Sequence, residues 1–256
     1  MLRRYRALHP GSSLGHMLVF ALCRNICRAF LTGFYRVRSS GKRHVAQHGP
    51  LLIIANHQSF LDPPLVGSYL GHRHTDFIAR GGLFSFKPLG ALISALNSIP
   101  VGEGRSETVA IKEALRRLKM GRAVILFPEG SRSPDGAMRP FKRGIALLVK
   151  KAGCPVVPAA IEGVHDAWPR DRARPFLFGR RVAVTYGAPI PHAELMADGA
   201  DAALRRLERQ IDAMRLELRA ELRNRSGGRY PPPGPGDEPF AAHADGESGP
   251  GDEGAE

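Results

Sequence analysis

Short apolar runs alternate with longer amphipathic segments along most of the chain. The runs predict strands, which we expect at 51–55, 77–79, 99–101, 123–127, 156–161 and 182–186. The segments between them carry apolar residues at helical spacing and predict helices at about 63–70, 86–96, 106–120, 142–151 and 201–224. Continuous apolar strands separated by helices are typical of a parallel sheet buried on both faces. The pattern therefore predicts an α/β fold: a single domain with a mostly parallel central sheet flanked by helices.

A longer apolar segment, residues 14–35, precedes the first of these strands. Large apolar side chains recur at every fourth position along one side of the predicted helix: Leu18, Leu22, Ile26, Phe30 and Phe34. Arg24 and Arg28 lie on another side, and the longest uncharged apolar run, 17–23, is shorter than the roughly 20 residues that span a bilayer. We expect an amphipathic membrane-interfacial helix within a membrane-associating segment, 1–35. A helix packed on the protein's own core is the alternative, and the two arrangements do not exclude each other.

Charge is distributed unevenly along the chain. The sequence has 37 Lys and Arg against 24 Asp and Glu, a net charge of +13. Residues 226–256 contain one base and seven acids, so residues 1–225 carry +19. A body this basic attracts nucleic acid, anionic lipid headgroups or a phosphorylated substrate, and charge alone does not choose among them. Since Gly, Pro and acids dominate 226–256, we expect a disordered acidic tail there and the globular domain at 36–225.

Polar residues follow two of the predicted strands at their carboxyl ends, where ligands gather in sheets of this kind. After the strand at 51–55, His57 precedes Asp62 by five residues. At this spacing the carboxylate can orient the imidazole as a general base. Asp62 followed by Pro63 is equally suited to start a helix, so the spacing leaves a structural role open.

The second cluster follows the strand at 123–127. It runs Pro128-Glu129-Gly130-Ser131-Arg132-Ser133, with Lys142 further along. Glycine permits close backbone approach, and the serine and arginine side chains supply donors suited to a phosphate. An ordinary polar turn is the alternative, because the adjoining Pro-Asp-Gly is a turn signature.

Taken together, the two clusters resemble the glycerolipid acyltransferase family, whose best-known members are the 1-acylglycerol-3-phosphate acyltransferases. The resemblance covers roughly residues 35–190 and rests on NHQSFLD at 56–62 followed by FPEGSRS at 127–133. FKRG at 141–144 and VPA at 157–159 resemble two further blocks of the family.

One block departs from the family pattern. The family's second block usually has the form P-V-x-R, and here Glu103 stands at the position of that arginine, with Arg105 two residues further on.

The resemblance implies transfer of an acyl group from acyl-coenzyme A or acyl carrier protein to the free hydroxyl of a lysophospholipid, with 1-acylglycerol-3-phosphate as the first choice and phosphatidate as its product. It implies His57 as the base and Asp62 as its orienting partner. The implied phosphate ligands are Glu129, Gly130, Ser131 and Arg132, with Arg105 and Lys142 in second rank. Because a thioester is already activated, we expect no covalent acyl-enzyme, and we expect no cofactor and no metal.

The implied partners are a membrane lipid substrate, an anionic membrane surface and the acyl donor. Three cysteines are too few for a disulfide framework, which favours a reducing compartment. We therefore expect a peripheral or monotopic protein on the cytoplasmic face of a membrane.

Four alternatives stay open at this point. The protein could act on another lysolipid or release the acyl group to water as a thioesterase. Gly11-Ser12-Ser13-Leu14-Gly15 matches the nucleophile pattern of serine hydrolases, which requires a preceding strand. The net charge also suggests a nucleic-acid-binding protein, but the chain has no zinc-finger or RNP-type motif, so we expect no nucleic-acid partner.

Overall fold

A computed structural model of the chain describes residues 8, 10–84, 87–96, 98–101 and 107–240. Its strands form one sheet in the order β1-β7-β6-β2-β5-β3-β4. Their bounds are β1 (Arg38–Ser40), β2 (Leu51–Ala55), β3 (Thr75–Arg80), β4 (Ile99–Val101), β5 (Ala123–Leu126), β6 (Val156–Glu162) and β7 (Ala183–Tyr186). From β6 to β4 all neighbours are parallel, whereas β7 is antiparallel to β6 and parallel to β1. The predicted α/β fold with a mostly parallel sheet is confirmed.

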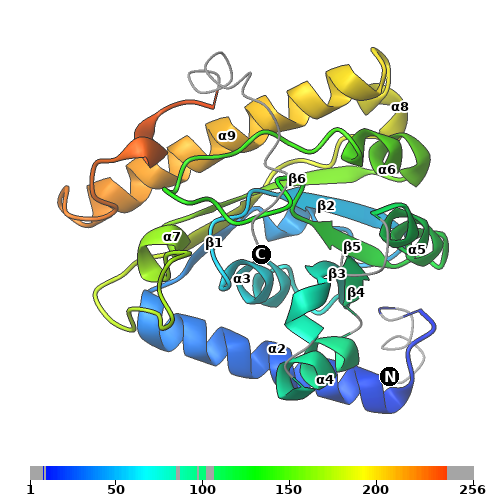
Figure 1. Cartoon of the computed structure of the whole chain (residues 1–256), viewed down its shortest axis with the longest axis horizontal. Helices are drawn as coiled ribbons and strands as arrows, with labels where there is room; N and C mark the ends of the chain where they lie inside the picture. Colours follow the sequence, from blue (N-terminus) through cyan, green and yellow to red (C-terminus); the bar gives the residue numbers. More distant parts are fainter. Residues whose placement is uncertain (1–7, 9, 85–86, 97, 102–106, 241–256) are drawn as a thin grey trace.

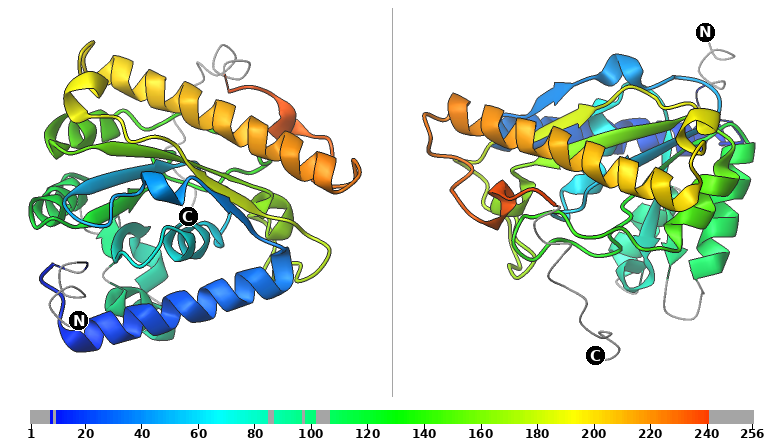
Figure 2. Two further views of the ribbon diagram at one scale, coloured as in Figure 1. Left: turned by 180° about the vertical axis from the view of Figure 1, so that it is seen from behind. Right: turned by 90° about the horizontal axis from the view of Figure 1, so that it is seen from above.

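Helices cover both faces of this sheet (Figures 1 and 2). One face is covered by α5 (Glu107–Lys119), α6 (Ile145–Ala152) and α9 (Ala200–Arg225). The other face is covered by α2 (Leu14–Tyr35), α3 (Asp62–Tyr69) and α7 (Val164–Ala167), with α4 (Lys87–Ala95) beside α2. The remaining elements are α8 (His192–Leu195) and the 3-10 helices η1 (Lys42–His44), η2 (Gly81–Phe84) and η3 (Pro235–Asp237).

The central strands are apolar throughout because both of their faces are covered. Every residue of β2, β5 and β6 is buried. Along β2, Leu52 and Ile54 pack toward α5, α6 and α9, whereas Leu51 and Ile53 pack toward α2 and α3. This alternation follows from the two-residue period of a strand.

Helix α2 has the bounds that the sequence predicts, and it uses two of its sides. Met17, Phe20, Leu31 and Tyr35 are buried against the domain, which confirms the core-packed alternative. The side chains of Leu18, Leu22 and Ile26 point away from the domain and are 61%, 61% and 58% exposed. By length and composition the helix could also cross a membrane, a test that signal sequences and core helices pass as well.

The arginines of α2 contact the domain. Arg24 donates to the carbonyl oxygen of Gly71 at 3.2 Å, and the guanidinium of Arg28 lies over the ring of Tyr69. These contacts correct the interfacial picture at one point: Arg24 and Arg28 contact the domain, whereas the apolar side chains that face outward are those of Leu18, Leu22 and Ile26.

The start of the predicted acidic tail is ordered against α9, so the expectation of disorder from residue 226 is wrong for residues 226–240. The Tyr230 side chain is buried, and its hydroxyl donates to Gly163 at 2.5 Å. Arg219 and Arg223 of α9 donate to backbone carbonyls of the segment at 2.7 and 3.0 Å. The segment is held through its backbone carbonyl oxygens, which every residue has. An argument from amino-acid composition therefore cannot predict these bonds. Residues 241–256 lie outside the described residues.

Candidate active site

The histidine and the aspartate singled out by their spacing form a hydrogen-bonded pair. Nδ1 of His57 lies 2.7 Å from Oδ2 of Asp62. The Asp62 side chain is fully buried, while that of His57 is 19% exposed. The imidazole stacks on Phe127, with the ring centroids 4.5 Å apart. Because Nδ1 is occupied by the carboxylate, Nε2 is the nitrogen available to a substrate.

Asp62 orients the histidine loop and does not cap its own helix. It is the first residue of α3, and Leu61 stands at the N-cap position without a side-chain hydrogen bond. Oδ2 of Asp62 accepts from the amides of Gln58 and Ser59 at 2.6 and 2.7 Å, in addition to the imidazole. The simple helix-start interpretation of Asp-Pro is therefore wrong for this carboxylate.

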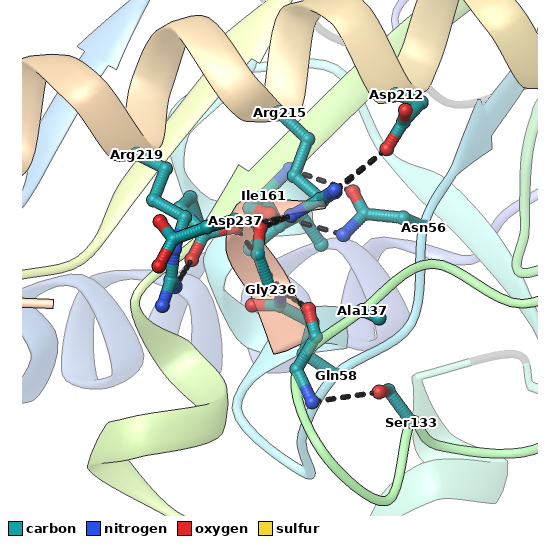
Figure 3. Close-up of polar contacts among 12 residues, drawn as sticks. Asn56, Gln58, Ser133, Ala137, Ile161, Asp212, Arg215, Arg219, Gly236 and Asp237 are labelled. Atoms are coloured by element: carbon teal, nitrogen blue, oxygen red, sulfur yellow. Dashed lines mark hydrogen bonds and ion pairs between the residues drawn. The ribbon is translucent and has the colours of Figure 1, made fainter. Parts of the chain in front are cut away.

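Buried amide side chains fasten the histidine loop to its neighbours (Figure 3). Asn56 donates to and accepts from the backbone of Ile161 in β6, at 3.0 and 2.8 Å. Gln58 donates to the carbonyl oxygen of Gly136 at 2.9 Å and to the carboxylate of Glu162 at 3.1 Å. These bonds fix the loop with respect to β6 and to the loop after β5, which reduces the reorganisation needed during a reaction.

Glu129 joins the two polar loops. Its carboxylate accepts from the amide of His57 at 2.7 Å and from the amide of Arg139 at 3.1 Å. The side chain is buried, and this burial raises the pKa of Glu129 to about 8, against the lowering effect of the two amide donors. The structure thus places Glu129 in the framework between the loops and not on a cavity wall.

Four of the other predicted phosphate ligands line one cavity together with the histidine. His57, Gly130, Ser131, Arg132 and Lys142 all contribute to a cavity of about 640 Å³. Ser131 also accepts a hydrogen bond from Arg139 at 2.7 Å.

The backbone conformation at position 130 favours glycine. Its φ of 73° lies in the left-handed region, which side chains other than glycine rarely adopt. A Cβ atom at this position would also contact the flexible end of the Lys142 side chain, which would have to shift.

The far part of the cavity is apolar. It is lined by side chains from the strands and from α5 and α6: Ile78, Ala110, Ile111, Leu126, Ile145 and Leu148. Phe60, Phe127 and Arg170 line the same cavity, and sequence reasoning gave them no role in the site. Phe127 could have been found as the last residue of an apolar run that leads into the polar loop, whereas no motif marks Arg170.

Two sequence predictions concern residues elsewhere. Arg105 and Glu103 lie outside the described residues. Ser13 is the N-cap of α2 and accepts a hydrogen bond from the amide of His16, and residues 10 and 11 before it form a turn. Among the described residues before Ser13, there is therefore no strand of the kind that a serine-hydrolase nucleophile needs. Within the described residues, no group of three or more His, Cys, Asp or Glu could hold a metal ion.

Comparison with known sequences supports the resemblance. Residues 36–162 match the family model described as Acyltransferase. A chloroplastic 1-acyl-sn-glycerol-3-phosphate acyltransferase of Brassica napus is 34% identical over 53% of this chain and 40% of its own length. The 1-acyl-sn-glycerol-3-phosphate acyltransferase alpha of Ovis aries is 29% identical over 76% of this chain and 67% of its own length. The chain thus spans less than half of the plant relative and two thirds of the animal one.

A solved structure has the same fold. The crystal structure of the 1-acyl-sn-glycerophosphate acyltransferase PlsC from Thermotoga maritima superposes with a TM-score of 0.69 at 27% sequence identity, covering 78% of this chain and 80% of that one. The region that matches the family model, residues 36–162, contains both polar loops, and the fold places these loops at one cavity. The sequence blocks, the matched family model, these relatives and the shared fold together support a place for the chain in the glycerolipid acyltransferase family, and the relatives it matches are 1-acyl-sn-glycerol-3-phosphate acyltransferases.

Proposed function

We propose that the protein transfers a fatty acyl group from a thioester donor to the free hydroxyl of 1-acylglycerol-3-phosphate and so forms phosphatidate. One observation carries the proposal: the bonded His57–Asp62 pair lies at a cavity that also presents Arg132 and Lys142 and has an apolar interior. A base, cationic ligands and space for a hydrocarbon chain are the three features that this reaction requires.

In the proposed reaction, Nε2 of His57 accepts the proton of the acceptor hydroxyl as its oxygen attacks the thioester carbonyl. Asp62 holds the imidazole through Nδ1 and stabilises the imidazolium that forms. The tetrahedral intermediate then collapses, the carbon–sulfur bond breaks, and the thiolate takes up the proton from the imidazolium of His57, which restores the neutral base. The leaving thiolate is stable enough that the reaction needs no acyl-enzyme.

The lipid class and the donor are tested together in one assay. Purified protein in detergent is given palmitoyl- and oleoyl-thioesters with a panel of lysolipids, and both free thiol and acylated lipid are measured. We expect thiol release to match phosphatidate formation with 1-acylglycerol-3-phosphate. Thiol release without an acylated lipid would identify a thioesterase instead. A preference for another lysolipid would show that 1-acylglycerol-3-phosphate is not the acceptor.

The apolar part of the cavity is proposed to hold an acyl chain, which gives a prediction for Ala110. This side chain is buried in α5 and lines the cavity. Phenylalanine there should fill part of the space, so that kcat/KM for oleoyl donors falls about tenfold relative to decanoyl donors, since one or two displaced methylenes cost about 1–2 kcal/mol. The control is Val109→Phe, next to it on α5 but exposed and not a lining residue. Equal losses for both chain lengths would argue against a chain-binding role.

The acceptor is a membrane lipid, and the outward side of α2 is proposed to contact the membrane. Replacing Leu18, Leu22 and Ile26 together by glutamine should lower partition into anionic vesicles at least about tenfold, because each exposed side chain loses transfer free energy on the order of 1 kcal/mol or more. The measurement is vesicle sedimentation at high salt. Leu147→Gln on α6, also exposed, is the control and should sediment like wild type. Unchanged sedimentation of the triple variant would remove α2 from the membrane contact.

A further inference from the structure

The cavity wall near the histidine has a cation that no family block marks. Arg170 follows α7 in a turn and lines the cavity together with Arg132 and Lys142. The three side chains come from two connections: Arg170 from the one after α7, and Arg132 and Lys142 from the one between β5 and α6. The fold therefore brings together positive charges that are far apart in sequence.

Arg132 is held in place by contacts that leave it able to bind an anion. Its guanidinium carbon lies 3.6 Å from the centroid of the Phe60 ring, which fixes the plane of the group. Phe60 in turn packs against Trp168, with their ring centroids 5.4 Å apart. Nη1 of Arg132 is buried, and in the described part of the chain it has no hydrogen-bond partner. A buried guanidinium nitrogen without an acceptor is costly, so this position favours an incoming ligand.

Arg170 and Arg132 line the same cavity. Burial, and after it the positive charge of Arg170, lower the pKa of Arg132, while the charge of Asp62 acts in the opposite direction. Among the described residues, no carboxylate lies within ion-pair distance of either arginine. Two guanidinium groups that repel each other at a cavity wall gain most from an anion with several acceptor oxygens, and a phosphate monoester has three of them.

We propose that Arg170 is a phosphate-binding residue, and that it and Arg132 together hold the phosphate of the 1-acylglycerol-3-phosphate acceptor. This inference rests on the proposed function and extends it to the headgroup. The loop after α7 then contributes to acceptor specificity in a chain that has Glu103 where the sequence pattern leads one to expect an arginine.

The central variant is Arg170→Gln, with Arg174→Gln as its control. Arg174 is an exposed arginine of the same loop and does not line the cavity. For Arg170→Gln we expect KM for 1-acylglycerol-3-phosphate to rise about tenfold or more, as for loss of a hydrogen bond between charged groups, with kcat within about twofold. KM for uncharged monoacylglycerol should not change. An unchanged KM for the phosphorylated acceptor would overturn the inference and leave the proposed function standing.

A coenzyme A donor also carries phosphate groups, so the source of the phosphate is tested separately. The acceptor titrations are repeated with an acyl thioester of N-acetylcysteamine, which has no phosphate. We expect the same rise in KM for 1-acylglycerol-3-phosphate with this donor. A rise in KM for the coenzyme A donor alone, with none for the acceptor, would overturn the assignment to the acceptor.

A binding measurement makes the inference independent of turnover. Glycerol 3-phosphate is titrated into wild type, Arg170→Gln and Arg174→Gln, and binding is followed by calorimetry. We expect the dissociation constant to rise about tenfold for Arg170→Gln only. If wild type binds glycerol 3-phosphate in this way but acylates no acceptor, the proposed function fails while the phosphate site stands. Equal binding by all three proteins would remove Arg170 from the site.

Discussion

Replacement of His57 by alanine is expected to lower kcat by about 10²–10⁴-fold, the usual contribution of a positioned general base. The physical reason is that the imidazole of His57 is held in position at the cavity: Asp62 accepts from Nδ1 at 2.7 Å and Phe127 stacks on the ring. The measurement is phosphatidate formation at saturating acceptor and donor. KM for the acceptor should change little, since its phosphate is held elsewhere in the cavity.

Two further measurements separate a chemical role from a structural one. His57→Gln can still donate to Asp62 but lacks a basic ring nitrogen, so it should fold like wild type and be as inactive as the alanine variant. Titration with glycerol 3-phosphate should give wild-type affinity for both variants. A folded His57→Ala protein with wild-type kcat would show that the proton is removed by another group.

Much of the site could be predicted because its residues are local in sequence. His57 and Asp62 are five residues apart at the end of one strand, so backbone geometry alone brings their side chains together. The loop after β5 is predictable for the same reason, because parallel neighbours end at the same edge of a sheet. Arg170 could not be found in this way. It lies at the cavity because of the course of the loop after α7, and no hydrophobic periodicity in the sequence predicts that course.

The strands of the fold were predicted where burial makes them apolar, and missed where it does not. β1 pairs with β7, yet its three residues are all exposed and polar, so they carry no hydrophobic signal. Helix α2 shows a related limit. Its bounds follow from its pattern, but two of its sides are apolar, and only the packing decides that Leu31 is buried and Leu22 is exposed.

The second large effect is expected at Glu162, which connects α9 to the histidine loop. Its fully buried carboxylate accepts from Arg219 at 2.7 Å and lies 3.6 Å from Arg215. It also accepts from Gln58, the neighbour of the proposed base. Burial raises the pKa of Glu162, and the two arginines oppose this rise. The Glu162 carboxylate is thus a shared ion-pair partner of two buried arginines, Arg215 and Arg219.

Glu162→Ala should reduce the free energy of unfolding by about 3–5 kcal/mol, because it leaves Arg215 and Arg219 buried without this partner. The measurement is urea unfolding followed by circular dichroism. Glu221→Ala is the control: this carboxylate pairs with Arg38 at 2.5 Å, both side chains are partly exposed, and the expected loss is below about 1 kcal/mol. Equal losses for the two variants would mean that burial adds nothing to the Glu162 interactions.

The same arginines explain why residues 226–240 are ordered despite their composition. Arg215 donates to the carbonyl oxygen of Gly236 at 2.5 Å, and Arg219 pairs with Asp237 at 2.8 Å. Each arginine therefore bonds to an acid within the domain and to the C-terminal segment at once. If Glu162 fixes the arginines, its loss should also release this segment, so Glu162→Ala should be cleaved by a protease between 226 and 240 faster than Glu221→Ala under native conditions. Destabilisation of Glu162→Ala without faster cleavage there would show that the segment is held independently of the buried carboxylate.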